Sequence, residues 1–281
     1  MESSVQQTKA EAFRRMHLGP RILVLPNAWD AASAMIFAQS GFGAIATTSG
    51  GVAWSLGYSD GQRMSRAEML DAVARITRAV SVPVSADLEA AYGSTPEAVA
   101  DTMRQAIAVG VCGVNFEDGT GLADRPLVDV ERQVENIRAI REAAAASGVP
   151  LVINARVDTY LRGVSDDAGR FVETIRRAHA YLQAGADCIF VIGLRRADII
   201  SRLAPEIPGP LNILTGPGAP SIPELEKMGV ARISFGSGPM AAALGLVKRM
   251  ARELHESGTY TTLTQSDVTT GEMNRLFERS A

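Results

Sequence analysis

The sequence predicts an α/β protein built as a (β/α)8 barrel of the TIM type, and three observations support this. A phrase recurs along the 281 residues, in which a helix-like segment is followed by a glycine and a short apolar run. Eight apolar runs are continuous rather than alternating, as in parallel strands buried on both faces. The segments between them have helical period. This favours a barrel over an open doubly wound sheet, and no G-x-G-x-x-G follows an early strand.

The recurring phrase marks four strands, because its glycine suits the end of a helix, where a positive φ costs little. These four segments are "QSGFGAIATT" at 39–48, "AVGVCGVNFED" at 108–118, "QAGADCIFVIG" at 183–193 and "EKMGVARISFG" at 226–236. The other four expected strands are "RILVLP" at 21–26, "VPVSAD" at 82–87, "PLVINAR" at 150–156 and "PLNIL" at 210–214.

Amphipathic helices are expected at 66–80, 129–148 and 169–185, each with an apolar stripe and a charged opposite face. The catalytic barrel should therefore occupy residues 1–257. Residues 258–281 form a polar tail that ends in a short helix around Met273, Leu276 and Phe277. Such a short helix is marginal in water, so we expect it to dock on this barrel or on a neighbouring subunit.

The composition excludes several classes of protein. The net charge is −3, without a basic cluster, which argues against binding to nucleic acid or to an anionic membrane. No apolar stretch suits a signal peptide or a membrane span. The two cysteines, Cys112 and Cys188, lie in apolar runs and suit a reducing compartment. We therefore expect a cytoplasmic protein that acts on a small molecule.

Carboxylates gather where two neighbouring strands are expected to end, the end at which such barrels carry out chemistry. Asp87 and Glu89 are two residues apart and would face the same side of an extended strand. Glu117 follows the next strand. Three unpaired carboxylates in one pocket repel one another, and all-oxygen ligands suit Mg²⁺ or Mn²⁺. The alternative is that these acids cap helices or pair with arginines.

Two further strand ends have alternative interpretations. Arg156 could clamp a substrate carboxylate with two N–H groups, or it could pair with Glu117 or Asp158. The segment Ser49–Gly51 could offer backbone N–H groups to an anionic oxygen, or it could be a plain tight turn.

Other polar residues also follow the strands. Asp60 ends the loop after the second strand, and we expect it to act in catalysis together with Glu117 and Arg156. Asn212 lies on the seventh strand, and we expect it to bind substrate.

Lysine and histidine usage excludes two mechanisms. None of the three lysines ends a strand, so a Schiff-base aldolase is excluded. The three histidines fall in helical segments, so a histidine proton relay is not expected.

Five ordered segments carry a family resemblance, and together they span about residues 10 to 250. They are "LPNAWDAASA", "TTSGGVAWSLGYSD", "VSADLEAAYG", "GVNFEDG" and "INARVDTYL". The chain resembles the isocitrate lyase / phosphoenolpyruvate mutase superfamily, and within it the short bacterial members that are methylisocitrate lyase-like or carboxyphosphonoenolpyruvate mutase-like.

The resemblance implies a Mg²⁺-dependent barrel that acts on 2-oxo or 2-hydroxy acids through a pyruvate-type enolate. By motif position, the residues expected around the metal are Asp60, Asp87, Glu89 and Glu117, several of them acting through water. Ser49, Gly50 and Gly51 resemble the segment that binds the carboxylate and the enolate oxygen, and Arg156 resembles the substrate-binding arginine. The resemblance also implies a homotetramer with a C-terminal helix swapped between subunits.

The loop after the fourth strand departs from this family. It reads "EDGTGLADRPLVD" and lacks both the cysteine of the lyases' K-K-C-G-H loop and the lysine of the phosphonomutases. Decarboxylation needs mainly an enolate-stabilising site. The sequence therefore predicts a Mg²⁺-dependent decarboxylase or C–C lyase that acts on an oxaloacetate-like acid. The alternatives are a P–C bond enzyme, such as a phosphonopyruvate hydrolase or a phosphonomutase, and a non-catalytic 2-oxo acid binder.

Overall fold

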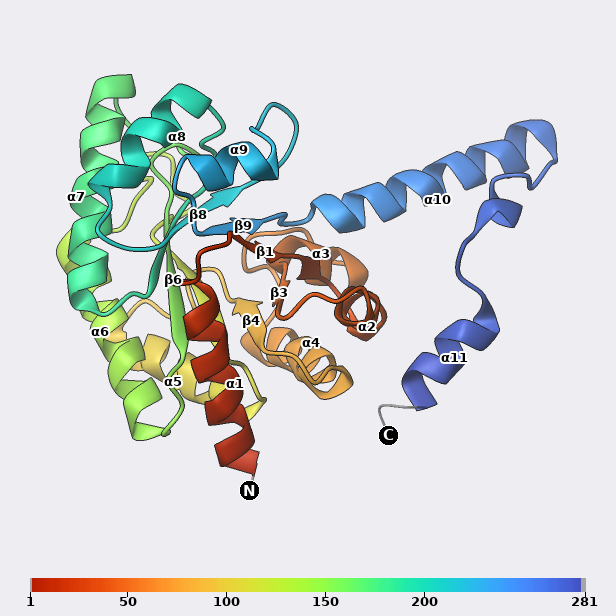
Figure 1. Ribbon diagram of the computed structural model, residues 1–281, viewed down its shortest axis with the longest axis horizontal. Helices are drawn as coiled ribbons and strands as arrows, with labels where there is room; N and C mark the ends of the chain where they lie inside the picture. Colours follow the sequence, from red (N-terminus) through yellow and green to blue (C-terminus); the bar gives the residue numbers. More distant parts are fainter. Residues whose placement is uncertain (1, 279–281) are drawn as a thin grey trace.

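The computed structural model describes residues 2–278, and its centre is a sheet of nine parallel strands (Figure 1). The strands are β1 (Leu23–Leu25), β2 (Asn27–Ala28), β3 (Ile45–Thr47), β4 (Val84–Asp87), β5 (Gly113–Glu117), β6 (Val152–Val157), β7 (Cys188–Val191), β8 (Leu211–Leu214) and β9 (Arg232–Ser234). Their spatial order is β1-β9-β8-β7-β6-β5-β4-β3-β2.

The sheet is a nearly closed barrel, because its first and last members belong to one extended segment. Pro26 separates β1 from β2, and a proline has no N–H to donate to a ladder. β1 pairs with β9 while β2 pairs with β3, so the strand order returns to its start. The predicted TIM-type fold is confirmed. Each expected run contains a strand, and only the short β2 falls outside the eight runs.

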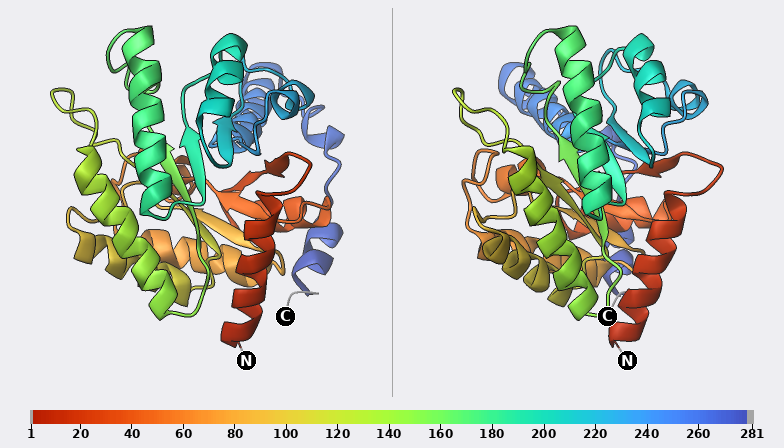
Figure 2. Two further views of the ribbon diagram at one scale, coloured as in Figure 1. Left: turned by 60° about the vertical axis from the view of Figure 1, so that its left-hand side comes forward. Right: turned by 90° about the vertical axis from the view of Figure 1, so that its left-hand side faces the viewer.

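Helices connect the strands and cover the barrel (Figures 1 and 2). Their bounds are α1 (Glu2–Met16), α2 (Ala31–Gln39), α3 (Ser49–Ser55), α4 (Arg66–Ala79), α5 (Pro96–Ala108), α6 (Val130–Ala146), α7 (Asp167–Ala184), α8 (Ala197–Leu203), α9 (Ile222–Lys227), α10 (Gly238–Ser257) and α11 (Thr270–Glu278). The three helices expected from periodicity are α4, α6 and α7. None of the helices within residues 2–278 has the length and apolar character needed to cross a membrane.

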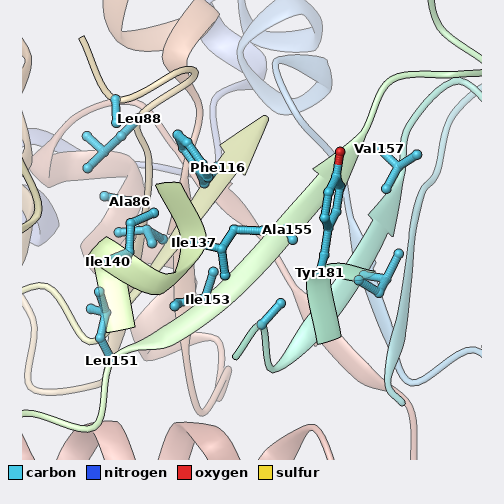
Figure 3. Close-up of a cluster of buried hydrophobic side chains, with 14 of the residues drawn as sticks. Ala86, Leu88, Phe116, Ile137, Ile140, Leu151, Ile153, Ala155, Val157 and Tyr181 are labelled. Atoms are coloured by element: carbon cyan, nitrogen blue, oxygen red, sulfur yellow. The ribbon is translucent and has the colours of Figure 1, made fainter. Parts of the chain in front are cut away.

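Strand β6 has one apolar face and one polar face, whereas we expected apolar residues on both faces. Ile153, Ala155 and Val157 face the helical layer, where the side chains of α6 and Tyr181 of α7 pack (Figure 3). Successive side chains of a strand point to opposite faces, so Asn154 and Arg156 face the interior. β5 shows the same alternation. The inner face is therefore buried but polar, and it leads towards the carboxyl ends of the strands.

Helix α1 closes the amino-terminal end of the barrel. Phe13 is fully buried in a cluster with Leu25 and Val152. A Cβ built on Gly113, the first residue of β5, would lie 2.6 Å from the Phe13 ring. The absence of a side chain at Gly113 therefore lets Phe13 enter the barrel floor.

After β9 the chain leaves the barrel along α10 and returns to it with α11. Helix α10 projects away from the barrel, and α11 follows it after a bend (Figure 1). Leu276 of α11 is buried against residues of α2 and α4, including Met35 and Ile76, and Met273 packs on the same cluster. Phe277 stays 42% exposed. The tail helix thus docks on its own barrel, the first of the two positions that we expected.

Candidate functional site

The candidate site lies at the carboxyl ends of β3 to β6. Asp87 is the last residue of β4, Glu117 is the last residue of β5, and Arg156 is the last but one of β6. The ladder between β5 and β6 places Glu117 directly opposite Arg156. Parallel strands present their carboxyl ends at one rim of the barrel, so these three predicted residues come together there.

Glu89 reaches the site by a route that differs from our expectation. Strand β4 ends at Asp87, and Glu89 has a φ of +52°, in the left-handed region. The expectation that Asp87 and Glu89 share one face of an extended strand was therefore wrong. Ala91 and Tyr92 are left-handed too, so the chain turns sharply here. The turn leaves Glu89 buried, and its Oε1 accepts a hydrogen bond from the Gln62 backbone N–H at 3.1 Å.

Arg156 is held by two carboxylates. Its Nε and Nη2 donate to the two oxygens of Asp158 at 2.6 and 2.9 Å, and its Nη1 lies 2.5 Å from Glu117 Oε2. Asp158 is fully buried and also contacts Arg162 Nε at 3.4 Å. The salt-bridge interpretation of Arg156 is thus observed. The guanidinium still has N–H groups beyond these three contacts.

The Asp87 carboxylate is held from two sides. Its Oδ2 accepts from the Ser49 N–H at 3.0 Å, and its Oδ1 accepts from Asn115 Nδ2 at 3.5 Å. Its own backbone N–H donates to Thr47 Oγ1 at 2.9 Å. The carboxylate is therefore oriented by the protein.

The segment Ser49–Gly51 is the first turn of α3, all of it buried. Thr48 caps the helix, and its Oγ1 accepts from the Gly51 N–H at 3.4 Å. The first N–H groups of a helix have no intrahelical acceptor. Since Ser49 donates to Asp87 and Gly51 donates to Thr48, the Gly50 N–H is left, and residues 2–278 supply it with no acceptor.

Gly50 also explains the position of Asp60. A Cβ at Gly50 would lie 2.9 Å from Asp60 Oδ2 and 2.7 Å from Ser237 Oγ. The missing side chain thus allows a carboxylate and a hydroxyl to pack against the start of α3. Asp60 itself is exposed, which places it on the solvent side of this turn.

Asn212 lies apart from the other predicted residues. It is fully buried on β8, its Nδ2 donates to Ser234 Oγ at 3.1 Å, and its Oδ1 accepts from that hydroxyl at 3.3 Å. In this structure Asn212 is part of the polar barrel interior, and its amide groups are already paired.

Two carboxyl groups of the site have a raised pKa, mainly because they are buried. Burial, aided by Asp87, raises the pKa of Glu89 to about 7. Burial and the neighbouring carboxylates also raise the pKa of Glu117, while Arg156 opposes that shift. The Glu117 carboxylate also raises the pKa of Arg156. Because the two groups are in contact, we describe them as an ion pair.

The donor set fits Mg²⁺ bound largely through water. Among residues 2–278, no group of three or more His, Cys, Asp or Glu side chains is arranged to hold a metal ion directly. Asp87, Glu89 and Glu117 therefore do not act as three direct ligands in this arrangement. Mg²⁺ usually binds one or two carboxylates and keeps several waters. Burial, with a smaller effect of the neighbouring carboxylates, raises the pKa of Glu89 and Glu117, and a bound dication would favour the ionised form of both groups.

Sequence reasoning missed Asn115 and Gln62, which hold Asp87 and Glu89. Asn115 lies two residues before Glu117 on β5, so its position on the inner face was available from the alternation of the strand. Gln62 lies in a loop and contacts Glu89 only because the turn after β4 brings that residue close. No local pattern predicts that contact.

The comparisons with known proteins agree with this architecture. Residues 13–255 match the family model described as phosphoenolpyruvate phosphomutase. An uncharacterized protein of Mycobacterium tuberculosis is 37% identical over 246 residues, which are 87% of this chain and 89% of that protein. The 2-methylisocitrate lyase of Bacillus subtilis is 28% identical over 268 residues, which are 92% of this chain and 85% of that enzyme.

A solved structure from Burkholderia cenocepacia, described as a lyase/mutase, superposes with a TM-score of 0.91 at 39% identity. The match covers 98% of this chain and 97% of that one. Since the family model covers most of the chain and the architecture agrees, the protein belongs to the phosphoenolpyruvate phosphomutase family, within the isocitrate lyase / phosphoenolpyruvate mutase superfamily.

Proposed function

We propose that the protein is a Mg²⁺-dependent lyase that breaks a C–C bond of a small 2-oxo or 2-hydroxy dicarboxylic acid. Decarboxylation of an oxaloacetate-like acid is the leading reaction. The observation that carries the proposal is the group of three carboxylates, Asp87, Glu89 and Glu117, around one clamped arginine at the barrel rim. Glu89 and Glu117 are buried, Asp87 is half-buried, and the arginine is Arg156. The lyase named among the relatives supports the same class of reaction.

Asp87, Glu89 and Glu117 would hold the dication, mostly through water, and Mn²⁺ could replace Mg²⁺. When bound, the ion supplies Lewis-acid stabilisation of the negative charge that develops on the 2-oxo oxygen. The Gly50 N–H at the start of α3 is suited to hydrogen-bond the same oxygen. Ser49 and Gly51 fix the position of that donor, because their own N–H groups are bound by Asp87 and Thr48.

Arg156 would bind the substrate carboxylate with the N–H groups that its neighbours leave. Asp158 and Glu117 fix the plane of the guanidinium, so a carboxylate would meet donors of set direction. Asp60, packed against Gly50, would act next to this site. Asn212 would contribute to substrate binding from the barrel interior. To do so, its amide would have to give up its hydrogen bonds with Ser234.

The position of the thiols favours decarboxylation over cleavage that needs a cysteine acid. Cys112 directly precedes β5 and Cys188 opens β7, so both lie at the amino-terminal end of the barrel and both are buried. The loop from Gly119 to Leu127 lies at the site end, is closed by an antiparallel bridge, and contains no cysteine or lysine. Protonation of the product by water is therefore the step that this chain suits.

The test is a proton NMR time course with oxaloacetate and Mg²⁺. Free Mg²⁺ alone decarboxylates this acid slowly, so only pyruvate formed above the rate without protein counts. We expect protein-dependent pyruvate formation that stops with EDTA and falls at least about 100-fold in Glu117→Gln. The matched control is Glu142→Gln, at an exposed position of α6 outside the site, which should keep the parent rate.

Absence of pyruvate above the free-metal rate would refute oxaloacetate as the substrate. The same assay then receives 2-methylisocitrate, 2,3-dimethylmalate and phosphonopyruvate. Turnover of phosphonopyruvate would assign P–C chemistry. Broadening of the resonances of an added 2-oxo acid, with no turnover of any compound, would assign a non-catalytic binder.

We also propose a homo-oligomer in which α10 packs on a second copy of the chain. Met240, Leu244, Val247, Ala251 and Leu254 recur at spacings of four and three along this helix. Such a spacing forms one apolar stripe. Only Met240 of α10 is buried, whereas Leu244, Val247 and Leu254 are about half exposed, at 45%, 51% and 54%. A long helix with this stripe gains stability when another surface covers it.

A further inference from the structure

Arg232 is the unusual cation of this barrel. It lies on β9 with 0% exposure, yet it forms no ion pair with a carboxylate within residues 2–278. Two other arginines of the barrel are paired: Arg156, which is 12% exposed, with Glu117 and Asp158, and the buried Arg177 with Asp118 and Glu173. A buried charge without a counter-ion is unfavourable, so the contacts that Arg232 does make are informative.

Those contacts form a directed chain that begins on α1. The His17 ring lies with Nδ1 2.9 Å from the Phe13 carbonyl oxygen and Nε2 3.4 Å from Arg232 Nη1. A carbonyl can only accept, so Nδ1 carries the proton and Nε2 accepts from the guanidinium. Burial lowers the pKa of His17 to about 3, in agreement with a neutral ring. The floor of the barrel thus fixes one end of Arg232.

The other end of Arg232 fixes an amide. Its Nη2 donates to Asn115 Oδ1 at 3.3 Å, and Asn154 Nδ2 donates to the same oxygen at 2.7 Å. Two donors at Oδ1 determine which way the Asn115 amide points. The Nδ2 group of Asn115 must then face away from them, and it lies 3.5 Å from Asp87 Oδ1.

We propose that Arg232 and Asn115 are positioning residues for the dication. The Phe13 carbonyl, His17, Arg232 and Asn115, which we call the support chain, orient the Asp87 carboxylate from inside the barrel, while the Ser49 N–H holds its other oxygen. This inference rests on the proposed function, because it takes Asp87 as a residue that binds the dication. According to this proposal, the buried Arg232 guanidinium raises the affinity for the metal and does not contact the substrate.

Electrostatics alone predicts the opposite effect of removing Arg232. A cation below the site repels a dication, so its loss would tighten metal binding. The support chain predicts weaker binding, because Asn115 would lose the donor that sets its amide and Asp87 would lose its orientation. Partners behind a metal ligand typically change metal affinity by about 10- to 100-fold. The sign of the change therefore separates the two accounts.

The experiment titrates Mn²⁺ alone into the metal-free full-length protein and measures free Mn²⁺ by electron paramagnetic resonance. We expect Arg232→Met and Asn115→Leu each to weaken Mn²⁺ binding by about tenfold or more. The double variant should bind Mn²⁺ at most about twofold more weakly than the single variant with the lower affinity, because both substitutions interrupt the same support chain. The control is Thr102→Val, an apolar substitution at a buried polar residue of α5 whose hydroxyl donates to the Ala98 carbonyl and accepts from Arg66, and it should bind like the parent protein.

Unchanged or tighter Mn²⁺ binding in folded Arg232→Met and Asn115→Leu would overturn the support chain while leaving the metal site intact. If the parent protein itself does not bind Mn²⁺, both the proposed function and the proposed role of the support chain are refuted. Near-UV circular dichroism checks folding. Should Arg232→Met not fold, Arg232→Lys, which keeps the buried charge, and Asn115→Leu decide by the same tenfold criterion.

Discussion

Asp158 shows how strongly single residues of the site depend on one another. It has 0% exposure, and its two oxygens take Nε and Nη2 of Arg156. Removing one partner of a buried ion pair typically destabilises a protein by about 3–5 kcal/mol, because the other charge stays buried. Arg156 is therefore a structural residue as well as the proposed carboxylate clamp, and a loss of activity on its replacement has to be compared with the loss of stability.

Glu89 gives a pH-dependent prediction at this scale. Its pKa in the folded protein is about 7, above its ordinary value of 4.5. Between these values the folded state binds more protons than the unfolded state. The free energy of unfolding therefore falls as the pH rises from 4.5 to about 7, and then levels off. For the metal-free protein we expect a total fall of roughly 3 kcal/mol from this residue.

Urea unfolding in EDTA between pH 5 and pH 8 measures this fall. Glu89→Gln should reduce the measured fall by the contribution of Glu89, and Glu117, whose pKa is also raised, should account for the fall that remains. Glu173→Gln is the control. Arg176 and Arg177 lower the pKa of Glu173, so its titration lies below this range. An unchanged fall in Glu89→Gln would contradict the assignment.

At the scale of elements, two short features position the site. The turn after β4 places Glu89 through left-handed backbone, and the start of α3 places Ser49, Gly50 and Gly51 through the Thr48 cap. Both features are anchored in the main core, the turn by Leu88 and Ala91 and helix α3 by Val52 and Ala53. Each depends on the strand before it, since β4 and β3 are neighbours in the barrel.

Gly50→Ala tests the start of α3. Its Cβ would lie 2.7 Å from Ser237 Oγ and 2.9 Å from Asp60 Oδ2, so both side chains must move. We expect activity to fall at least about tenfold, since displacements of about 1 Å can cost 100-fold. The free energy of unfolding should change by no more than about 1 kcal/mol, because the displaced atoms end short side chains and alanine favours helix.

The readouts for Gly50→Ala are the pyruvate assay and urea unfolding. Gly271→Ala is the control, because a Cβ there, near the start of α11, meets no atom closer than 3.4 Å. That variant should keep the parent activity. Full activity of Gly50→Ala would show that Asp60 and the start of α3 tolerate movement and would argue against their proposed roles.

At the scale of the whole molecule, helix α10 differs from the helices of the barrel in how much of its apolar surface is covered. The barrel buries a continuous core between its strands and the surrounding helices. Helix α10 buries only Met240 and leaves its apolar stripe in solvent, which a barrel helix in the outer layer would not do. The apolar core of the barrel is therefore covered by the chain's own helices, whereas the apolar stripe of α10 stays about half exposed.

A double substitution on that stripe tests the proposed oligomer. Leu244→Asp with Val247→Asp places two charges on the exposed stripe of α10, so we expect the oligomer to dissociate to monomers in sedimentation velocity. Val172→Asp, at a 65% exposed position of α7, is the matched control and should sediment like the parent protein. A parent protein that already sediments as a monomer, or a double variant that stays oligomeric, would refute the proposed contact.

The sequence by itself determined the barrel and the rim residues. Strand ends can be located from apolar runs and glycines, and all strands of a parallel barrel end at one rim, so Asp87, Glu117 and Arg156 could be predicted. Glu89 was predicted for the wrong reason, because the left-handed turn after β4 carries no local signal strong enough to replace the assumption of an extended strand.

Tertiary structure alone decided the depth of each side chain and the identity of its partners. Asn212 and Asn115 are both asparagines on strands, yet one pairs with Ser234 in the interior and the other reaches Asp87. Arg232 meets His17 across 215 residues of chain. Such contacts depend on how the strands are staggered when the barrel closes, and on helix α1, which closes its amino-terminal end. Hydrophobic period and turn residues are local and carry no information about either.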